Sequence, residues 1–344
     1  MLFKVKKPSP TDSREDIKKE NELMKKRVLA IVCMLAMVLS LAACGGAPAA
    51  DDGKFTVGIC QLVTHDALDA ATQGFKDALI AELGEDKVVF LEENAAGDSA
   101  LCGTICTDFV SKDVDLILAN ATPALQAAAA ATEDIPILGT SVTEYGVALE
   151  IKDFSGTVGG NVSGTSDLAP LDKQADMIVE WFPEAKNVGL LYCSAEANSL
   201  YQVNTVKAYL EQKGLTCTLF PFADTNDVAA VTQNAADASD VIYVPTDNTV
   251  ASNSELIDNV CRPAGVPIIA GEEGICSGCG VATLSISYYD LGVATGKMAA
   301  KILSGEANIA EMPVEYAATQ TPKFNAEICA ELGLTAPAGY VEIQ

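Results

Sequence analysis

Short apolar runs alternate with helix-forming segments along nearly the whole chain after residue 54. Residues 115–144, DLILANATPALQAAAAATEDIPILGTSVTE, hold one such unit. The runs at 115–119 and 135–138 are typical of strands that are buried on both faces, and the alanines between them have high helix propensity. A strand, a crossover helix and a second strand predict a βαβ unit of a parallel sheet.

The start of the helix in this unit predicts a ligand-binding end. Thr122 is a good N-cap and Pro123 suits the first helical position. Ligands of open α/β sheets bind outside the carboxyl ends of the strands, where helix N-termini offer free N–H groups and a positive dipole end. The pattern therefore predicts a site for a small anion such as a carboxylate, with a purely structural cap as the alternative.

The alternation predicts two α/β lobes, and 344 residues suit about two domains. The first series has expected strands at 55–60, 87–92, 115–119 and 135–138, and helices at 66–83, 99–110 and from Thr122 onward. Glycines and polar residues at 156–170 then interrupt the pattern, as a crossing between lobes would. The second series has expected helices at 171–182, 199–213, 227–238 and 249–261, and strands at 187–193, 215–222, 241–246 and 267–271.

The last elements are expected to cross back between the lobes: a strand at 281–287, a helix at 289–304 and an edge strand at 313–317. We therefore expect lobe 1 to comprise residues 55–160 plus about 289–320, and lobe 2 to comprise residues 161–288 plus about 321–344. The expected fold class is α/β, in which each lobe is a parallel sheet flanked by helices and a hinged cleft lies between the lobes.

Residues 24–46, MKKRVLAIVCMLAMVLSLAACGG, predict export with a lipid anchor. A basic start, an apolar core and Leu-Ala-Ala before Cys44 resemble the lipobox of bacterial lipoproteins. We interpret residues 1–43 as a signal region, with Met24 as the alternative start, and residues 44–54 as a lipidated flexible tether. A permanent membrane span is the alternative for the apolar run.

The charge of the chain excludes nucleic acid as a partner. Residues 1–43 hold 9 of the 22 basic and 5 of the 47 acidic residues, so the remainder carries 13 basic and 42 acidic residues, a net charge of −29. Such a surface repels phosphate backbones and keeps a protein soluble.

The cysteines do not predict a complete disulfide framework. Eleven are present, of which two lie in the signal and lipobox, and nine is an odd number. Cys276 and Cys279 have the spacing for a local disulfide, and Cys102 and Cys106 would be neighbours on a helix. With one histidine in the chain, a zinc site is not expected. Buried apolar side chains or one bridge are the remaining interpretations.

No motif of a catalytic site is present. The sequence has no P-loop, no G-x-S-x-G elbow and no H-E-x-x-H, and His65 has no histidine partner. We therefore expect neither an enzyme nor a cofactor. A cell-surface enzyme built on the same two-lobed frame is the alternative from a different class.

Six segments in order resemble the tryptophan/tyrosine ABC-transporter substrate-binding family. They are QLVTHDALDAATQGF, NATPALQAAAAAT, GNVSGTSD, VGLLYCSAEANS, YVPTDNT and ISYYDLG, and the resemblance spans residues 55 to about 337. It implies the type I periplasmic-binding-protein fold and the delivery of a small solute to a membrane permease.

The resemblance also implies a cleft formed by residues at the carboxyl ends of the strands. The expected ligand-binding residues are Gln61, His65, Thr122, Pro123, Ala124, Ser141, Val142, Thr143, Thr165, Ser166, Tyr192, Glu196, Asn198, Ser199, Thr246, Asp247, Asn248 and Glu272.

Asp247 is the expected partner of a ligand ammonium group, because a desolvated cation needs a counter-charge. Its alternative role is the N-cap of a helix that begins near Thr249, a role that Asn248 could fill instead. The ligand carboxylate is expected at Thr122. Four tyrosines are expected to be better placed than Trp181 for stacking on an aromatic solute, namely Tyr192, Tyr243, Tyr288 and Tyr289.

The sequence thus predicts a monomeric solute-binding lipoprotein of an ABC importer at the outer face of the bacterial cytoplasmic membrane. Its expected partners are an aromatic amino acid, tryptophan or tyrosine, and the permease and ATPase subunits of the importer. A ligand-sensing receptor subunit, and a binding protein for another amino acid or a nucleoside, are the alternatives.

Overall fold

The computed structural model describes residues 53–343, which form two sheets flanked by helices. The expected α/β class is confirmed. The first sheet has the order β11-β5-β4-β3-β1-β2, and every neighbouring pair in it is parallel. Its strands are β1 (Phe55–Gln61), β2 (Val88–Asn94), β3 (Leu116–Asn120), β4 (Ile137–Val142), β5 (Val162–Ser166) and β11 (Glu315–Tyr316).

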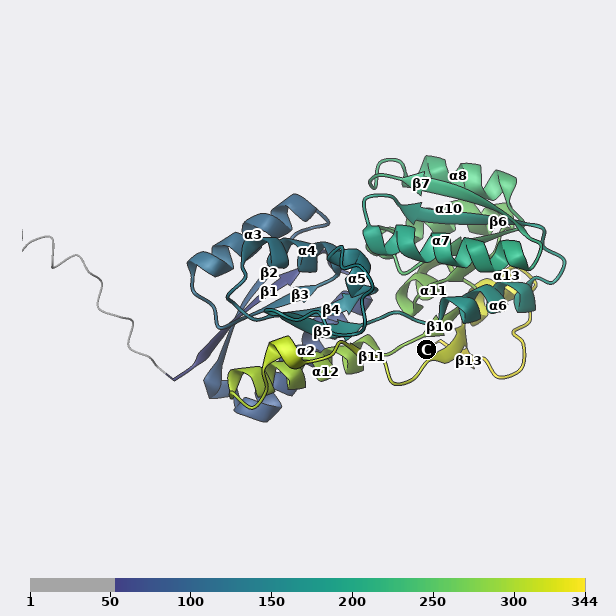
Figure 1. Ribbon diagram of the computed structural model, residues 1–344. Coiled ribbons are helices and arrows are strands. Elements are labelled where there is room, and N and C mark those ends of the chain that lie inside the picture. Colours follow the sequence, from purple (N-terminus) through teal and green to yellow (C-terminus); the bar gives the residue numbers. More distant parts are fainter. Residues whose placement is uncertain (1–52, 344) are drawn as a thin grey trace, which may run out of the picture. The chain divides into compact units, whose positions relative to one another are not determined.

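Helices cover both faces of the first sheet (Figure 1). On one face lie α3 (Ser99–Ser111), α4 (Thr122–Ala131) and α5 (Tyr145–Ala148), and on the other lie α2 (Asp66–Leu83) and α12 (Tyr288–Leu303). The helices α2 and α12 lie side by side although about 200 residues separate them. Glycine permits this approach, because a Cβ on Gly292 would lie 2.0 Å from the carbonyl oxygen of Ala71.

The second sheet has the order β13-β12-β10-β9-β8-β6-β7 and is parallel except where β12 pairs antiparallel with β10. Its strands are β6 (Asn187–Cys193), β7 (Thr216–Phe222), β8 (Val241–Val244), β9 (Ile268–Ala270), β10 (Ala282–Ser285), β12 (Thr321–Phe324) and β13 (Val341–Glu342). One face packs against α6 (Leu171–Trp181), α7 (Ala197–Gln212) and α13 (Ala326–Glu331). The other packs against α8 (Val228–Ala238), α9 (Asn248–Ala251), α10 (Ser254–Ala264) and α11 (Glu273–Cys279).

Within residues 53–343 the chain passes between the two sheets at 167–170, 286–287 and 317–320. The expected crossing at 156–170, and the expected start of lobe 2 at residue 161, therefore differ from the structure, because β5 pairs with β4 in the first sheet. Strand β5 reads VSGTS and looks like a loop in sequence, yet all five residues are buried. Gly164 is needed there, since a Cβ would lie 2.1 Å from the carbonyl oxygen of Gly139.

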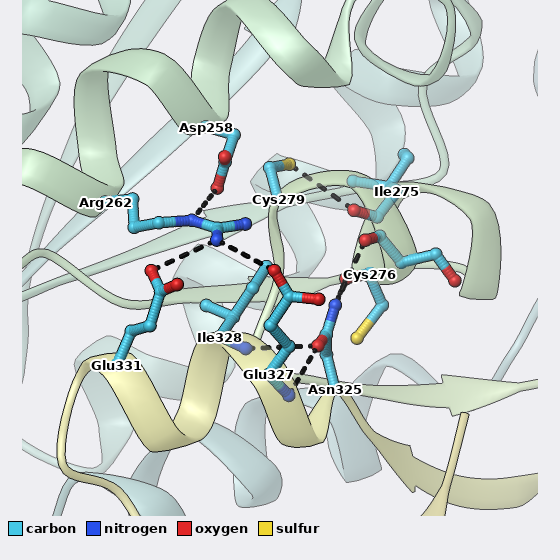
Figure 2. Close-up of polar contacts among 10 residues, drawn as sticks. Asp258, Arg262, Ile275, Cys276, Cys279, Asn325, Glu327, Ile328 and Glu331 are labelled. Carbon is cyan, nitrogen blue, oxygen red and sulfur yellow. Dashed lines mark hydrogen bonds and ion pairs between the residues drawn. The ribbon is translucent and has the colours of Figure 1, made fainter. Parts of the chain in front are cut away.

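One local expectation is also corrected. The helix expected at 249–261 is two helices, α9 and α10, with a break at 252–253. Of the two interpretations left open for Cys276 and Cys279, the structure has the buried side chains and not the local disulfide, since both residues lie buried on helix α11. The nine cysteines of the described chain are all free thiols, and Cys279 Sγ lies 3.4 Å from the carbonyl oxygen of Ile275 (Figure 2).

The signal region, the tether and Cys44 lie outside the described residues. Between residues 53 and 343, no helix has the length and apolar character needed to cross a membrane.

Candidate functional site

Residues of both lobes surround a small cavity, which we term the cleft cavity. It has a volume of about 10 Å³, which is the space of about one water molecule. Side chains from both lobes surround it, and His65 Nε2 of lobe 1 lies 3.2 Å from Asn248 Oδ1 of lobe 2. Its lining residues are His65, Leu68, Ser141, Thr143, Asp167, Asn198, Thr246, Asp247, Asn248, Ala251, Glu272 and Tyr288.

Eight of the residues expected from the sequence therefore line the cleft cavity: His65, Ser141, Thr143, Asn198, Thr246, Asp247, Asn248 and Glu272. A neighbouring cavity of about 150 Å³ also has walls from both lobes and adds Pro123 and Glu196. Gln61 lines a separate polar pocket beside α2. The other expected residues line neither cavity, and these are Thr122, Ala124, Val142, Thr165, Ser166, Tyr192 and Ser199.

Three carboxyl groups are buried around the cleft cavity. Asp167, Asp247 and Glu272 are 3%, 1% and 3% exposed, and no lysine or arginine is among the lining residues. Desolvation raises the pKa of Asp167 to about 6, that of Glu272 to about 7 and that of Asp247 to about 8. A cluster of this kind is suited to a cationic group, because buried charges are stable when they are paired.

The three carboxyl groups differ in their hydrogen bonds. Asp247 is the N-cap of α9, where its Oδ1 accepts from Val250 N at 2.9 Å and its Oδ2 accepts from Cys193 N at 2.7 Å. Glu272 is the N-cap of α11 and accepts from two backbone N–H groups. Asp167 Oδ2 accepts from the Tyr288 hydroxyl at 3.0 Å, whereas Asp167 Oδ1 has no hydrogen-bond partner.

Asp247 thus has the capping role that the sequence left open beside the ligand role, and Asn248 does not fill it. Asp167 is a site residue that the sequence did not predict, because no strand was expected at 162–166. The available signal was its place at the end of the segment GNVSGTSD, which belongs to the resemblance.

Uncharged polar groups lie at the ends of β3 and β4. The pairing of β4 with β5 shifts register between Gly139 and Val142, and Ser141 there has a left-handed backbone with φ of 53°. Such bulges re-aim side chains near functional sites. Ser141 Oγ is buried and has no hydrogen-bond partner.

Helix α4 begins beside these groups without a side-chain cap. The N-cap is Ala121, with φ of 94°, so the prediction of Thr122 as N-cap is wrong: Thr122 is already the first helical residue. Its buried Oγ1 has no hydrogen-bond partner. The uncapped first turn and two free hydroxyl groups, those of Thr122 and Ser141, are suited to an anion.

Unpaired polar atoms concentrate around this region. Of the nine buried side-chain N and O atoms without a partner in the described chain, five lie at or after the carboxyl ends of β3 to β6, on Asn120, Thr122, Ser141, Asp167 and Asn198. Buried polar groups in proteins are nearly always paired. The concentration therefore marks a surface that is suited to a polar ligand.

The aromatic side chains differ from the expectation. Tyr288 lines the cleft cavity, but Tyr192 and Tyr243 do not, and Tyr289 is 42% exposed and donates to Asp77. Trp181 packs in the core of lobe 2, as expected. In residues 53–343, no group of three or more histidine, cysteine, aspartate or glutamate side chains could hold a metal ion.

The sequence profile described as ABC transporter substrate binding protein matches residues 56–340. A curated relative, the "Tyrosine-binding protein" of Clostridioides difficile strain R20291, is 34% identical over 298 residues, which are 83% of this chain and 85% of the relative.

Two solved structures are each 35% identical to this chain and cover 84% of it and 100% of their own chains. One is the ABC domain in complex with L-Trp from Streptococcus pneumonia, with a TM-score of 0.80. The other is the ligand-free, open structure of a substrate binding protein with adhesive properties from Clostridium difficile, with a TM-score of 0.64. At equal identity, the described residues are thus more similar to the structure that holds a ligand.

Proposed function

Because the chain belongs to the ABC transporter substrate-binding protein family and has the two-lobed α/β fold of type I periplasmic binding proteins, we propose that it binds an amino acid in the cleft. The observation that carries this proposal is the division of charge around the cleft cavity. Three buried carboxyl groups line it, and the uncapped start of α4 and free hydroxyl groups lie at the neighbouring strand ends. A zwitterion has one group for each environment, whereas a simple anion or cation has a partner for one of them only.

The ligand is an aromatic amino acid, tryptophan or tyrosine. Two relatives of similar identity support this choice, since one is named as tyrosine-binding and the other was solved with L-Trp. The neighbouring cavity shares Asn248 with the cleft cavity and offers about 150 Å³ next to it for a side chain. Another amino acid or a nucleoside is the alternative solute.

The protein delivers this ligand unchanged to the permease and ATPase subunits of an importer, as a monomer anchored by lipid on Cys44 at the outer face of the cytoplasmic membrane. The lipobox sequence before Cys44 supports the anchor. A receptor subunit that reports the ligand to a signalling partner is the second reading of the same fold.

Calorimetry with L-tryptophan, L-tyrosine and L-phenylalanine tests the binding, with a nucleoside as control. We expect saturable binding of at least one aromatic amino acid and recovery of the same compound after incubation. Tight binding of the nucleoside alone, or recovery of a chemically altered amino acid, contradicts the proposal.

Replacement of Cys44 by serine tests the anchor. We expect the variant Cys44→Ser to carry no lipid and to keep its signal region, which mass spectrometry of the isolated protein measures. A variant that is processed and still anchored would show that the lipobox reading is wrong.

A further inference from the structure

We propose that Asp167, and not Asp247, binds the α-ammonium group of the ligand, and that Tyr288 couples this contact to the movement of the two lobes. The inference rests on the proposed amino-acid binding, and it assigns the ammonium site to a residue of the segment that joins the lobes.

Asp167 has hydrogen-bond capacity that the other two carboxyl groups lack. Both oxygens of Asp247 and both oxygens of Glu272 already accept from backbone N–H groups, three of them at helix starts and the fourth that of Cys193 at the end of β6. An ammonium group at either residue would compete with a helix cap. Asp167 Oδ1 has no partner although Asp167 is 3% exposed and lines the cleft cavity. An unpaired buried carboxylate oxygen is unfavourable unless a ligand supplies the donor.

Asp167 and Tyr288 lie beside two crossings between the lobes. Asp167 is the first residue of the crossing at 167–170, and its N–H donates to the carbonyl oxygen of Val142 at the end of β4. Tyr288 is the first residue after the crossing at 286–287. The hydrogen bond of 3.0 Å from the Tyr288 hydroxyl to Asp167 Oδ2 therefore joins the crossing at 167–170 to the start of α12, directly after the crossing at 286–287.

The contact between the ligand and Asp167 affects the closure of the two lobes. A ligand shifts a two-state equilibrium only through a difference in its affinity for the two states. An ammonium group at Asp167 contacts the segment that must bend, and the Tyr288 hydroxyl holds the other oxygen of the same carboxylate. Ligand binding and the relative position of the two crossings therefore both depend on the side chain of Asp167.

Isosteric variants test the ammonium contact. The wild type, Asp167→Asn and Asp247→Asn are titrated with L-tryptophan and L-tyrosine, and with indole-3-propionate and 3-(4-hydroxyphenyl)propionate, which lack the ammonium group. We expect the wild type to prefer the amino acids by at least about 30-fold, the lower end for a charge pair that loses one partner, and Asp167→Asn to lose this preference. Asp247→Asn should keep it, and the exposed Asp134→Asn serves as the matched control.

The outcomes separate this inference from the proposed function. A wild type that binds no amino acid contradicts the proposed function. A wild type that binds amino acids, with Asp167→Asn keeping its preference for the ammonium group, contradicts the inference alone. Loss of the preference in Asp247→Asn only would return the ammonium site to that residue.

Tyr288→Phe tests the coupling, with Tyr289→Phe as its control at the adjacent, exposed position. The phenylalanine keeps the ring and removes the hydrogen bond to Asp167. We expect Tyr288→Phe to retain the preference for the ammonium group but to release L-tryptophan about tenfold faster, the effect of one hydrogen bond to a charged group. Release rates from stopped-flow fluorescence that are equal in the two variants would overturn the coupling role. Equal unfolding midpoints without ligand would show that both variants fold.

Discussion

Asp167, Asp247 and Glu272 share one cavity but have different local surroundings. Backbone N–H groups at helix starts, and that of Cys193 at the end of β6, donate to the oxygens of Asp247 and Glu272, and the loss of either carboxylate would leave these groups unpaired. Asp167 has one oxygen bonded to Tyr288 and one oxygen without a partner. Carboxylate groups therefore hold backbone structure at two positions, and the third is available to a ligand.

Ligand affinity should depend on pH through Asp167. Burial raises its pKa to about 6, above its ordinary value of 3.8, so its contribution to the stability of the free protein is fully present below about pH 3.8 and is lost as the pH rises through about 6. An ammonium ligand needs the ionised form. We expect the affinity for L-tryptophan to fall about tenfold between pH 7.5 and pH 5, since about one molecule in ten is ionised at Asp167 at the lower pH.

The comparison with Asp167→Asn isolates this effect. The carboxyl group of Asp167 interacts electrostatically with Tyr288, Glu272 and Tyr145. His65 and Asp247 line the same cavity. These groups remain in the variant, so the pH dependence that they cause is common to both proteins, and we expect Asp167→Asn to lose the tenfold part that belongs to Asp167. Calorimetry at both pH values checks this. Equal pH dependence in the two proteins would assign the effect to the other groups.

At the scale of elements, the last part of the chain is fastened to lobe 2 by a small polar network (Figure 2). Arg262 of α10 lies 2.9 Å from Asp258 Oδ1 on the same helix, and its Nη1 lies 3.1 Å from Glu331 Oε2 of α13. Asn325 caps α13 and donates from its side chain to the carbonyl oxygen of Cys276 on α11. These contacts hold α13 against lobe 2, whose sheet includes β12.

Arg262→Ala should lower the free energy of unfolding by about 1 kcal/mol. The partly exposed acidic partners are screened by solvent, so the loss lies near the upper end for surface ion pairs. High salt should reduce the difference from the wild type. Urea unfolding at low and high salt measures it, with Lys207→Ala, which removes one helical pair with Glu211, as the control. An Arg262→Ala effect no larger than that of Lys207→Ala would rule out the network.

At the scale of the whole described chain, the cleft cavity is too small for the proposed ligand. A volume of about 10 Å³ holds one water molecule and not an amino acid. The His65 to Asn248 contact of 3.2 Å also joins the lobes directly. An amino acid can therefore enter only if the lobes move apart, and it can be enclosed only if they approach again.

Small-angle scattering should detect this movement. We expect the free protein to populate more open arrangements and saturating L-tryptophan to reduce the radius of gyration, because the ligand contacts both lobes and favours the closed state. Indole-3-propionate, which lacks the ammonium group, should produce less compaction at equal concentration. A radius that does not change with saturating L-tryptophan would indicate a preclosed cleft or a site on one lobe.

The alternation of strands and helices, the α/β class and the polar residues at most strand ends could be predicted from the residues alone. These features follow from local burial and helix propensity, which appear as short apolar runs and an alanine-rich segment such as residues 122–131. Eight residues named from strand ends line the cleft cavity for this reason, since the carboxyl ends of parallel strands meet at one edge of a sheet.

Which lobe holds β5, and which carboxylate is free, depend on contacts between distant parts of the chain. Strand β5 has a polar, glycine-containing sequence and is a strand because β4 and β11 lie on either side of it. Asp247 follows an expected strand, whereas Asp167 lies in a segment that the sequence predicted to be a crossing between lobes. Their roles differ because the N–H groups of Cys193 and Val250 reach Asp247, whereas Asp167 meets the side chain of Tyr288 from a distant crossing. Hydrogen-bond partners that lie far apart in the chain leave no periodic pattern in the sequence.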